Sequence, residues 1–354
     1  FATAEYADKK GEKMIEIFSK VEHYHRGIDL LASDFQDMGV AVLKNVSSEM
    51  EYQPAIVPGV LPENQILRDI VSSQSLEELN RATKHKLFNF EPATDSQPYF
   101  FNMLRLAPVT RLILSGKMLS GGGIAQGNLR ATITLGGLLV SLLTLAIFTI
   151  VVPLVFSGYL NKTKASPLFW PGAIYFILIG AGFMLIEIGF VQRLSVFLGH
   201  PIYALGILLF TLIASTGAGS FLSEYLPLKR SPGIYAYPIV TVLVIAVTQF
   251  LLTRICSQMA AAAMMIKIFA SVALLFPAGI MLGLFFPTGM HLAKKIAPDQ
   301  TPWYWALNGI FGVLFSAVAV FVSIYFGIYY NFYIAMLCYS AVLICLHRIL
   351  KSVK

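Results

Sequence analysis

Long apolar runs separated by short polar loops dominate residues 131–350 of the chain. Each run is near the ~20 residues that an α-helix needs to cross the hydrocarbon core of a bilayer. The pattern therefore predicts a polytopic α-helical membrane domain with about seven spans. The predicted spans are residues 131–156, 169–190, 201–222, 235–254, 268–289, 303–327 and 331–348. The last two are joined by a very short turn around Gly327, so we expect them to form an antiparallel hairpin.

Residues 1–110 have the mixed polar and apolar pattern of a soluble region. Helical spacing over residues 3–22 and 28–38 is followed by Val40–Leu43, a run that is typical of a β-strand. This alternation predicts a partial α/β region, which we interpret as a remnant of a Rossmann-like fold. The region contains too few predicted strands to form a complete doubly wound sheet.

A capping box and a flexible segment lead from this soluble region to the membrane. Ser75 and Glu78 have the spacing of a capping box at the start of a further helix. Residues 111–130 contain a run of three glycines and are predicted to be a flexible joint. We therefore expect a soluble α/β fragment at 1–110, then the joint, and a transmembrane helical domain at 131–350.

Composition supports lipid as the surroundings of most of the chain. Hydrophobic residues make up 56% and charged residues 13% of the sequence, whereas soluble domains carry roughly a quarter charged residues. The net charge of +7 is explained by Lys and Arg side chains in loops at the lipid headgroups, and no basic run indicates a nucleic-acid partner. We expect a multi-pass protein of a bilayer, of the bacterial inner (plasma) membrane type.

The sequence contains no pattern for a metal or a bound cofactor. Cys256, Cys338 and Cys345 are its three cysteines, and they lie in or beside predicted spans without a C-x-x-C pair. This placement indicates apolar packing rather than metal binding or a disulfide framework. We therefore predict neither a metal site nor a cofactor.

Glu187 is a carboxylate inside the second predicted span. A charge there costs a few kcal/mol or more, so the group must be neutral, paired or turned toward a wet cavity. One interpretation is a proton or substrate site. The other is an ion pair with Arg193 or another basic group that fixes helix packing, with Gly182 and Gly189 letting a neighbouring helix approach.

Further polar groups lie at or inside the predicted spans. Gln192, Arg193 and His200 fall in the loop that we expect after the second span, at the membrane interface. Asn308 lies in the sixth span, where we expect its amide to hydrogen-bond across helices. Glu187, Gln192, Arg193 and Asn308 are therefore the candidate intramembrane polar sites.

Small residues and prolines mark the third and fifth predicted spans. The small residues form the pairs Ala214/Ala218, Ser215/Gly219 and Gly279/Gly283. Residues of this size let helix backbones approach closely. Pro277 and Pro287 in the fifth span free backbone carbonyls that need new partners. The pattern indicates a kinked, tightly packed helix, or alternatively the broken helix of a transport site.

The sequence also carries a motif just ahead of the joint. Pro92-Ala-Thr-Asp95 is followed by Pro98-Tyr-Phe-Phe101, and the combination resembles the P-A-T-D-D-x-P-Y/F-F motif of membrane-bound spermidine synthase-like proteins. Three further stretches are similar to the membrane part of that family in order and spacing. They are Gly182–Ile188 with Gln192, Arg193 and Phe197–Pro201, then Phe286–Met290, and then Trp303–Gly309.

That family couples an aminopropyltransferase-type Rossmann domain to transmembrane helices. The resemblance thus implies that Thr94, Asp95, Pro98 and Tyr99 are family-motif residues, whereas the motif's second Asp is Ser96 here. Enzymes of the family bind decarboxylated S-adenosylmethionine through a Gly-rich loop and an acidic residue, and this sequence has no match for either. The chain therefore resembles the tail of the catalytic domain together with the membrane domain, and its catalytic residues stay unidentified.

Three functions are compatible with this interpretation. The chain is part of a membrane-tethered aminopropyltransferase-like enzyme whose catalytic half lies on a missing N-terminal segment or a partner subunit. Alternatively, it is a non-catalytic accessory subunit of a membrane complex, or a transporter of a small molecule or ion with Glu187 in its path. The start at Phe1 without a signal-peptide pattern favours a processed, split or incomplete product. We expect no catalysis by this chain alone, because it lacks a cofactor cradle and a general-base constellation.

Overall fold

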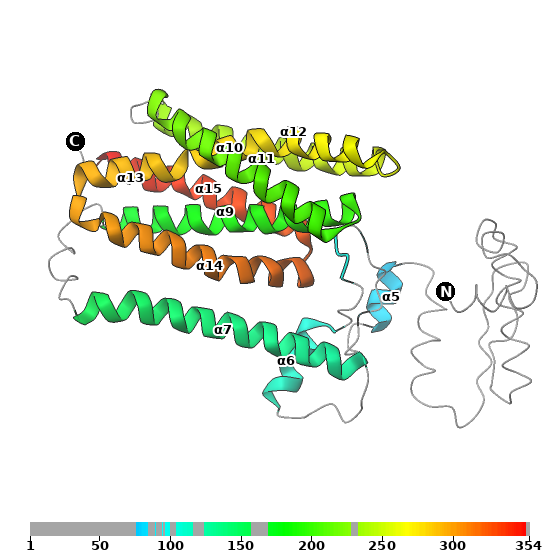
Figure 1. Cartoon of the computed structure of the whole chain (residues 1–354). Helices are drawn as coiled ribbons and strands as arrows, with labels where there is room; N and C mark the ends of the chain where they lie inside the picture. Colours follow the sequence, from blue (N-terminus) through cyan, green and yellow to red (C-terminus); the bar gives the residue numbers. More distant parts are fainter. Residues whose placement is uncertain are drawn as a thin grey trace, which may run out of the picture. The chain divides into compact units, whose positions relative to one another are not determined.

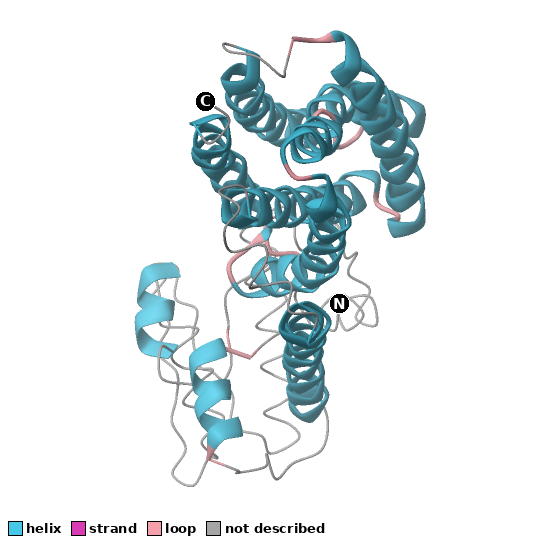
Figure 2. Ribbon diagram, turned by 90° about the vertical axis from the view of Figure 1, so that its left-hand side faces the viewer, coloured by secondary structure: helices cyan, strands magenta, loops and turns pink. Residues whose placement is uncertain are grey.

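A computed structural model describes most of the chain beyond residue 75. The described residues are 76–83, 89, 94, 96–99, 104–115, 124–156, 169–227 and 233–351. They belong to two compact units, Phe1–Pro92 with Met103–Lys117 and Ala93–Asn102 with Met118–Lys354. Nearly all described residues are helical, and none forms a named strand (Figure 2). The helices predicted at 3–22 and 28–38, and the strand predicted at Val40–Leu43, lie outside the described residues.

The first unit contributes two short helices to the described part of the chain. They are α5 (Leu76–Thr83) and α6 (Leu106–Leu114). The guanidinium of Arg105, just before α6, donates from Nη2 to Oδ1 of Asn80 in α5 at 2.9 Å. The helix predicted after the capping box is confirmed by α5, while Ser75 itself lies outside the described residues.

The second unit is a bundle of long apolar helices. Seven of the described helical segments are long and apolar enough to cross a membrane, which confirms the predicted number of spans. The helices are α7 (Ile124–Phe156), α9 (Phe169–Leu198), α10 (Pro201–Tyr225), α11 (Gly233–Gln258), α12 (Met264–Gly283), α13 (Phe285–Ile296), α14 (Thr301–Tyr325) and α15 (Ile328–Lys351). The bundle is that of a multi-pass integral membrane protein, with α12 and α13 together forming the fifth span.

Helix α9 lies at the centre of the bundle, packed between α14 and α15 (Figure 1). Glycines on α9 face both neighbours, because an added Cβ at Gly180 would press on the backbone carbonyl of Asn308 in α14. A Cβ at Gly182 would likewise meet the Tyr339 ring, and one at Gly189 the Phe332 ring, both on α15. The prediction that Gly182 and Gly189 admit a neighbouring helix is confirmed, and the neighbour is α15.

The two small-residue faces predicted on the third and fifth spans pack against each other. A Cβ at Gly219 of α10 would collide with the backbone carbonyl of Ile280 in α12, and Gly279 of α12 lies directly against the Ser215 side chain. Gly283 lies against the Thr216 carbonyl in the same way. The contact between α10 and α12 therefore uses the Ser215/Gly219 pair of α10 and the Gly279/Gly283 pair of α12.

The other predicted pair on α10 does not take part in this contact. Ala214 and Ala218 are both exposed on the surface of the bundle. Helical geometry explains why only one pair makes the contact. Residues four apart share one face of the helix, so Ser215 and Gly219 face α12 while Ala214 and Ala218 are rotated away from it. The sequence pattern alone contains both pairs and does not distinguish between them.

The fifth span is interrupted ahead of Pro287, while α12 continues through Pro277, so of the two predicted interpretations the broken helix describes it better. The α-helix pattern is interrupted at Leu284, between the end of α12 and the start of α13. Pro287 has no N–H, so the Gly283 carbonyl loses its helical donor. Near the break, the hydroxyl of Tyr175 in α9 donates to the Phe285 carbonyl at 2.7 Å. The Tyr175 hydroxyl of α9 thus supplies a hydrogen-bond donor close to the interruption of the fifth span.

Helices α14 and α15 form the predicted hairpin. Gly327 has φ +109°, a conformation that favours glycine. Its N–H lies 3.1 Å from the carbonyls of both Val322 and Ser323, which satisfies the C-terminal end of α14. The turn therefore needs only Phe326 and Gly327 to reverse the chain.

One predicted boundary is wrong. Helix α9 continues to Leu198, so Gln192 and Arg193 lie inside this helix and not in the loop after it. The helix ends at Gly199, with φ +71°, and Nζ of Lys267 in α12 donates to the Phe197 carbonyl at 3.2 Å. The lysine places a positive charge where the helix dipole is negative.

The contact between α10 and α12 can be tested with glycine variants of one helix. Gly219→Ala should lower the stability of the protein in detergent by about 1–3 kcal/mol, because the new methyl group overpacks a backbone contact. Gly206→Ala is the matched control, since a Cβ at Gly206 meets nothing within 4 Å. Thermal unfolding followed by circular dichroism measures both. Equal stability of the two variants would contradict the close approach of the helices.

Candidate functional site

The motif residues form a tight turn that belongs to the second unit. The N–H of Gln97 donates to the Thr94 carbonyl at 2.9 Å, and the hydroxyls of Thr94 and Ser96 are 2.9 Å apart. Thr94, Pro98 and Tyr99, singled out by the resemblance, are described in this segment, whereas Asp95 lies outside the described residues. We call residues 94 and 96–99 the motif segment.

The motif segment contacts the turn between α14 and α15. The N–H of Ile328, the first residue of α15, donates to the Ser96 carbonyl at 2.9 Å. The first N–H groups of a helix have no partner inside it, so Ser96 supplies one. A Cβ added at Gly327 would lie 3.4 Å from both the Ser96 carbonyl oxygen and the Gln97 side chain. These are ordinary van der Waals distances, so this turn requires glycine for its positive φ and not for space.

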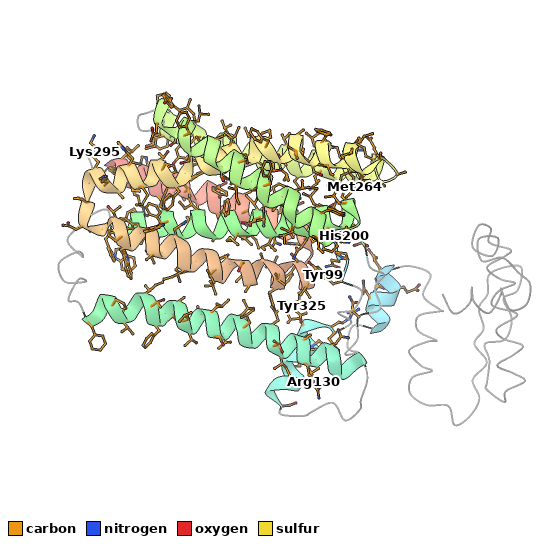
Figure 3. The ribbon with its side chains drawn as sticks, viewed as in Figure 1. Tyr99, Arg130, His200, Met264, Lys295 and Tyr325 are labelled. Atoms are coloured by element: carbon orange, nitrogen blue, oxygen red, sulfur yellow. The ribbon has the colours of Figure 1, made fainter. Side chains whose placement is uncertain are left out.

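Tyr99 ties the motif segment to the interior of the bundle. Its ring is half-buried and packs against the buried apolar core. Figure 3 labels Tyr99 and His200 near one end of the bundle and Lys295 near the other. Burial raises the pKa of the Tyr99 hydroxyl to about 12, and the neighbouring Ser323 hydroxyl lowers it slightly. The hydroxyl has no partner of good hydrogen-bond geometry among the described residues.

Three helices meet in a polar cluster beside Tyr99. The Ser323 hydroxyl of α14 lies 2.5 Å from Oε1 of Gln192 in α9 and 2.8 Å from the Ala319 carbonyl oxygen. A hydroxyl has one proton, so it donates to one of these two acceptors at a time. Nδ2 of Asn331 in α15 donates to Ser323 Oγ at 2.6 Å and to the Ala319 carbonyl at 3.1 Å. We call Gln192, Ser323 and Asn331 the polar cluster. Polar side chains that bond across helices hold spans together.

Arg193 lies next to this cluster and is almost fully buried. Its side chain is 3% exposed, and the guanidinium carbon lies 4.9 Å from the centre of the Tyr329 ring in α15. The Tyr329 hydroxyl is in turn 3.4 Å from the Thr253 hydroxyl of α11. A guanidinium over an aromatic face is attracted by the ring quadrupole. Arg193 therefore connects α9 with α15.

Glu187 lies on α9, and its role as a proton or substrate site stays a prediction. Its side chain is half-buried on α9, and among the described residues it makes no ion pair or side-chain hydrogen bond. The predicted pairing with Arg193 is not observed. The two residues are six positions apart on one helix, and residues at that spacing do not share a face.

Asn308 lines an open cavity at the surface of the bundle, where the lining residues Ile213 and Val313 are exposed. The cavity has a volume of about 640 Å³ and is bordered by α9, α10, the break between α12 and α13, α14 and α15. The Asn308 side chain lies against Gly180 of α9. The predicted hydrogen bond from Asn308 to another helix is not found among the described residues. Glu187, Gln192 and Arg193 do not line this cavity.

Sequence analysis missed two members of the polar cluster, Ser323 and Asn331. A signal for them exists, because they lie four residues before and four residues after Gly327. In a hairpin that turns at Gly327, these positions face each other. A serine and an asparagine placed in this way in apolar spans predict a hydrogen bond between the two helices.

The described residues contain no cluster of three or more His, Cys, Asp or Glu side chains that could hold a metal ion. The groups gathered in the sites described above are neutral hydrogen-bonding side chains, the buried guanidinium of Arg193 and an apolar cavity. Such groups can orient and bind a molecule or a neighbouring segment.

The polar cluster can be tested by removing its central hydroxyl. Ser323→Ala leaves Gln192 and Asn331 with lost partners inside the bundle, so stability should fall by about 1–3 kcal/mol. Ser316→Ala on the same helix is the control, because that hydroxyl bonds only the Val313 carbonyl of its own helix. Chemical denaturation in detergent compares the two. A loss as small for Ser323→Ala as for Ser316→Ala would mean that the cluster does not stabilise the bundle.

Comparison of the chain with protein-family models, with curated proteins and with solved structures gave no match. The arguments below therefore use only the residues and geometry of this chain.

Proposed function

We propose that the chain is the membrane domain of a spermidine synthase-like protein, where it anchors an α/β part to the bilayer and does not itself catalyse. The observation that carries the proposal is the position of the motif segment. It belongs to the same compact unit as the membrane helices. The segment thus connects the soluble region to the bundle.

The contacts of the motif segment support anchoring over catalysis. The Ser96 carbonyl is occupied by the Ile328 N–H, and the Tyr99 ring is packed on the core of the bundle. Groups held in this way stabilise the junction and are not free to bind a substrate. On this proposal, the S-adenosylmethionine-binding half is supplied by a further segment or by another subunit. The accessory-subunit alternative differs only in that no catalytic half is present.

The transporter alternative receives less support. Its best observation is the broken fifth span beside a cavity, an arrangement that transporters use. The path was expected to include Glu187, but Glu187 does not line that cavity, and no charged side chain does. A coupling ion or a charged substrate would lack a counter-charge there.

Anchoring predicts that removing the Tyr99 ring loosens the motif segment. Tyr99→Ala should raise the rate of proteolytic cleavage between residues 94 and 99 by about tenfold, since burying such a side chain contributes roughly 1.5–3 kcal/mol. Tyr203→Ala is the control, because that ring is 57% exposed on α10. Mass spectrometry of the fragments measures the rates in detergent. Unchanged cleavage in Tyr99→Ala would count against the anchoring role.

The absence of catalysis by this chain alone is tested by an aminopropyl-transfer assay. The chain in lipid nanodiscs is incubated with decarboxylated S-adenosylmethionine and putrescine, and we expect no spermidine above the protein-free background. Mass spectrometry detects the product. Spermidine formation that is lost in Asp95→Ala would show that the chain is itself an enzyme, and would refute this part of the proposal.

A further inference from the structure

Glycines border the cavity beside Asn308. A Cβ added at Gly217 of α10 or at Gly309 of α14 would meet nothing within 4 Å, although both residues line the cavity. A Cβ at Gly312 would meet only the Met184 side chain, at 3.6 Å. Gly217 and Gly309 are both exposed, so the volume of about 640 Å³ is open space beside glycines of α10 and α14. It is within the size range of small-molecule sites.

The walls of the cavity are mostly apolar and carry no charge. Aromatic and aliphatic side chains from six helices form most of the lining, and no Asp, Glu, Lys, Arg or His contributes to it. Two of its hydroxyls are already used within their own helices. Thr216 donates to the Leu212 carbonyl at 2.6 Å and Ser316 to the Val313 carbonyl at 2.7 Å. A charged molecule would lose its hydration in this space without gaining a partner.

The remaining polar groups of the lining include Asn308 and Gly283, besides the hydroxyls of Ser220 and Tyr339. The Asn308 amide makes no hydrogen bond to any described residue, and it offers two donors and an acceptor. Gly283 also lines the site, and its carbonyl lacks its helical donor because residue 287 is proline. The cavity thus combines a large apolar volume with a small hydrogen-bonding region.

We propose that this cavity binds an uncharged, lipid-soluble molecule with one hydrogen-bonding head group. The apolar part occupies the space beside Gly217 and Gly309, and a hydroxyl or carbonyl head group bonds the Asn308 amide. The molecule reaches the site from the bilayer, since the helices that border the site are membrane spans. Polyamines and other cations are excluded by the uncharged lining.

A photoactivatable probe tests the proposal with the full chain in nanodiscs. The probe is a long-chain alcohol that carries a diazirine on its alkyl chain, and mass spectrometry maps the labelled residues. We expect saturable labelling of α10, α13 and α14 at residues that line the cavity. Labelling that rises linearly with probe concentration would show only surrounding lipid, and would overturn the proposal.

Variants that fill the cavity provide the sharper test. Gly309→Leu should reduce saturable labelling by about tenfold or more, because the leucine occupies the space that an apolar ligand would fill. Gly217→Leu fills the same cavity from α10 and reports independently if Gly309→Leu does not fold. Gly206→Leu is the matched control, since its Cβ also meets nothing within 4 Å but Gly206 does not line the cavity. Equal labelling of the filled and control variants would refute the site.

The head-group contact is tested separately. Asn308→Leu should weaken binding of the alcohol probe by roughly three- to tenfold, as expected for one lost hydrogen bond, and should leave an alkane probe without the hydroxyl unaffected. A probe with a trimethylammonium head group should show no saturable labelling of the wild-type chain. Saturable labelling by that cation would overturn the assignment of an uncharged ligand.

Discussion

The bundle depends on close contacts between helix backbones. Inside a bilayer, lipid tails are as apolar as the helix surfaces, so helices associate through dense packing and hydrogen bonds. The glycines of α9 place aromatic rings of α15 and the backbone of α14 directly against the central helix. The small-residue contact between α10 and α12 joins these two helices in the same way. The spans keep their places because side chains are absent where helices cross.

The sequence predicted the parts of the fold that follow from local composition. The seven spans, the hairpin at Gly327 and the broken fifth span are each encoded in runs of apolar residues, glycines and prolines. The end of the second span was misplaced because hydropathy falls at Gln192 and Arg193. These residues continue the helix because tertiary partners stabilise them there, Ser323 for the amide and Tyr329 for the guanidinium.

The candidate sites were less predictable, because their members come from distant parts of the chain. Thr94, Pro98 and Tyr99 were singled out by the motif, but nothing local to them indicates that the neighbouring Ser96 and Gln97 contact the turn before Ile328. The Asn308 cavity lies beside glycines on two separate helices, and a sequence shows each glycine only as a small residue. Glu187 was predicted to be a functional or paired residue because a lone carboxylate in a span is costly. The described residues provide it with no charged partner.

The hydrogen bond between Ser96 and Ile328 has a consequence for the order of assembly. Nearly the whole membrane domain separates these residues along the chain, so their contact is among the most non-local ones in the molecule, and such contacts form late. Synthesis proceeds from the N-terminus, so Ser96 and its neighbours emerge long before the turn that receives them. Until the last two helices have been inserted, their eventual binding surface does not exist. Formation of this contact therefore reports that the turn between α14 and α15 is in place.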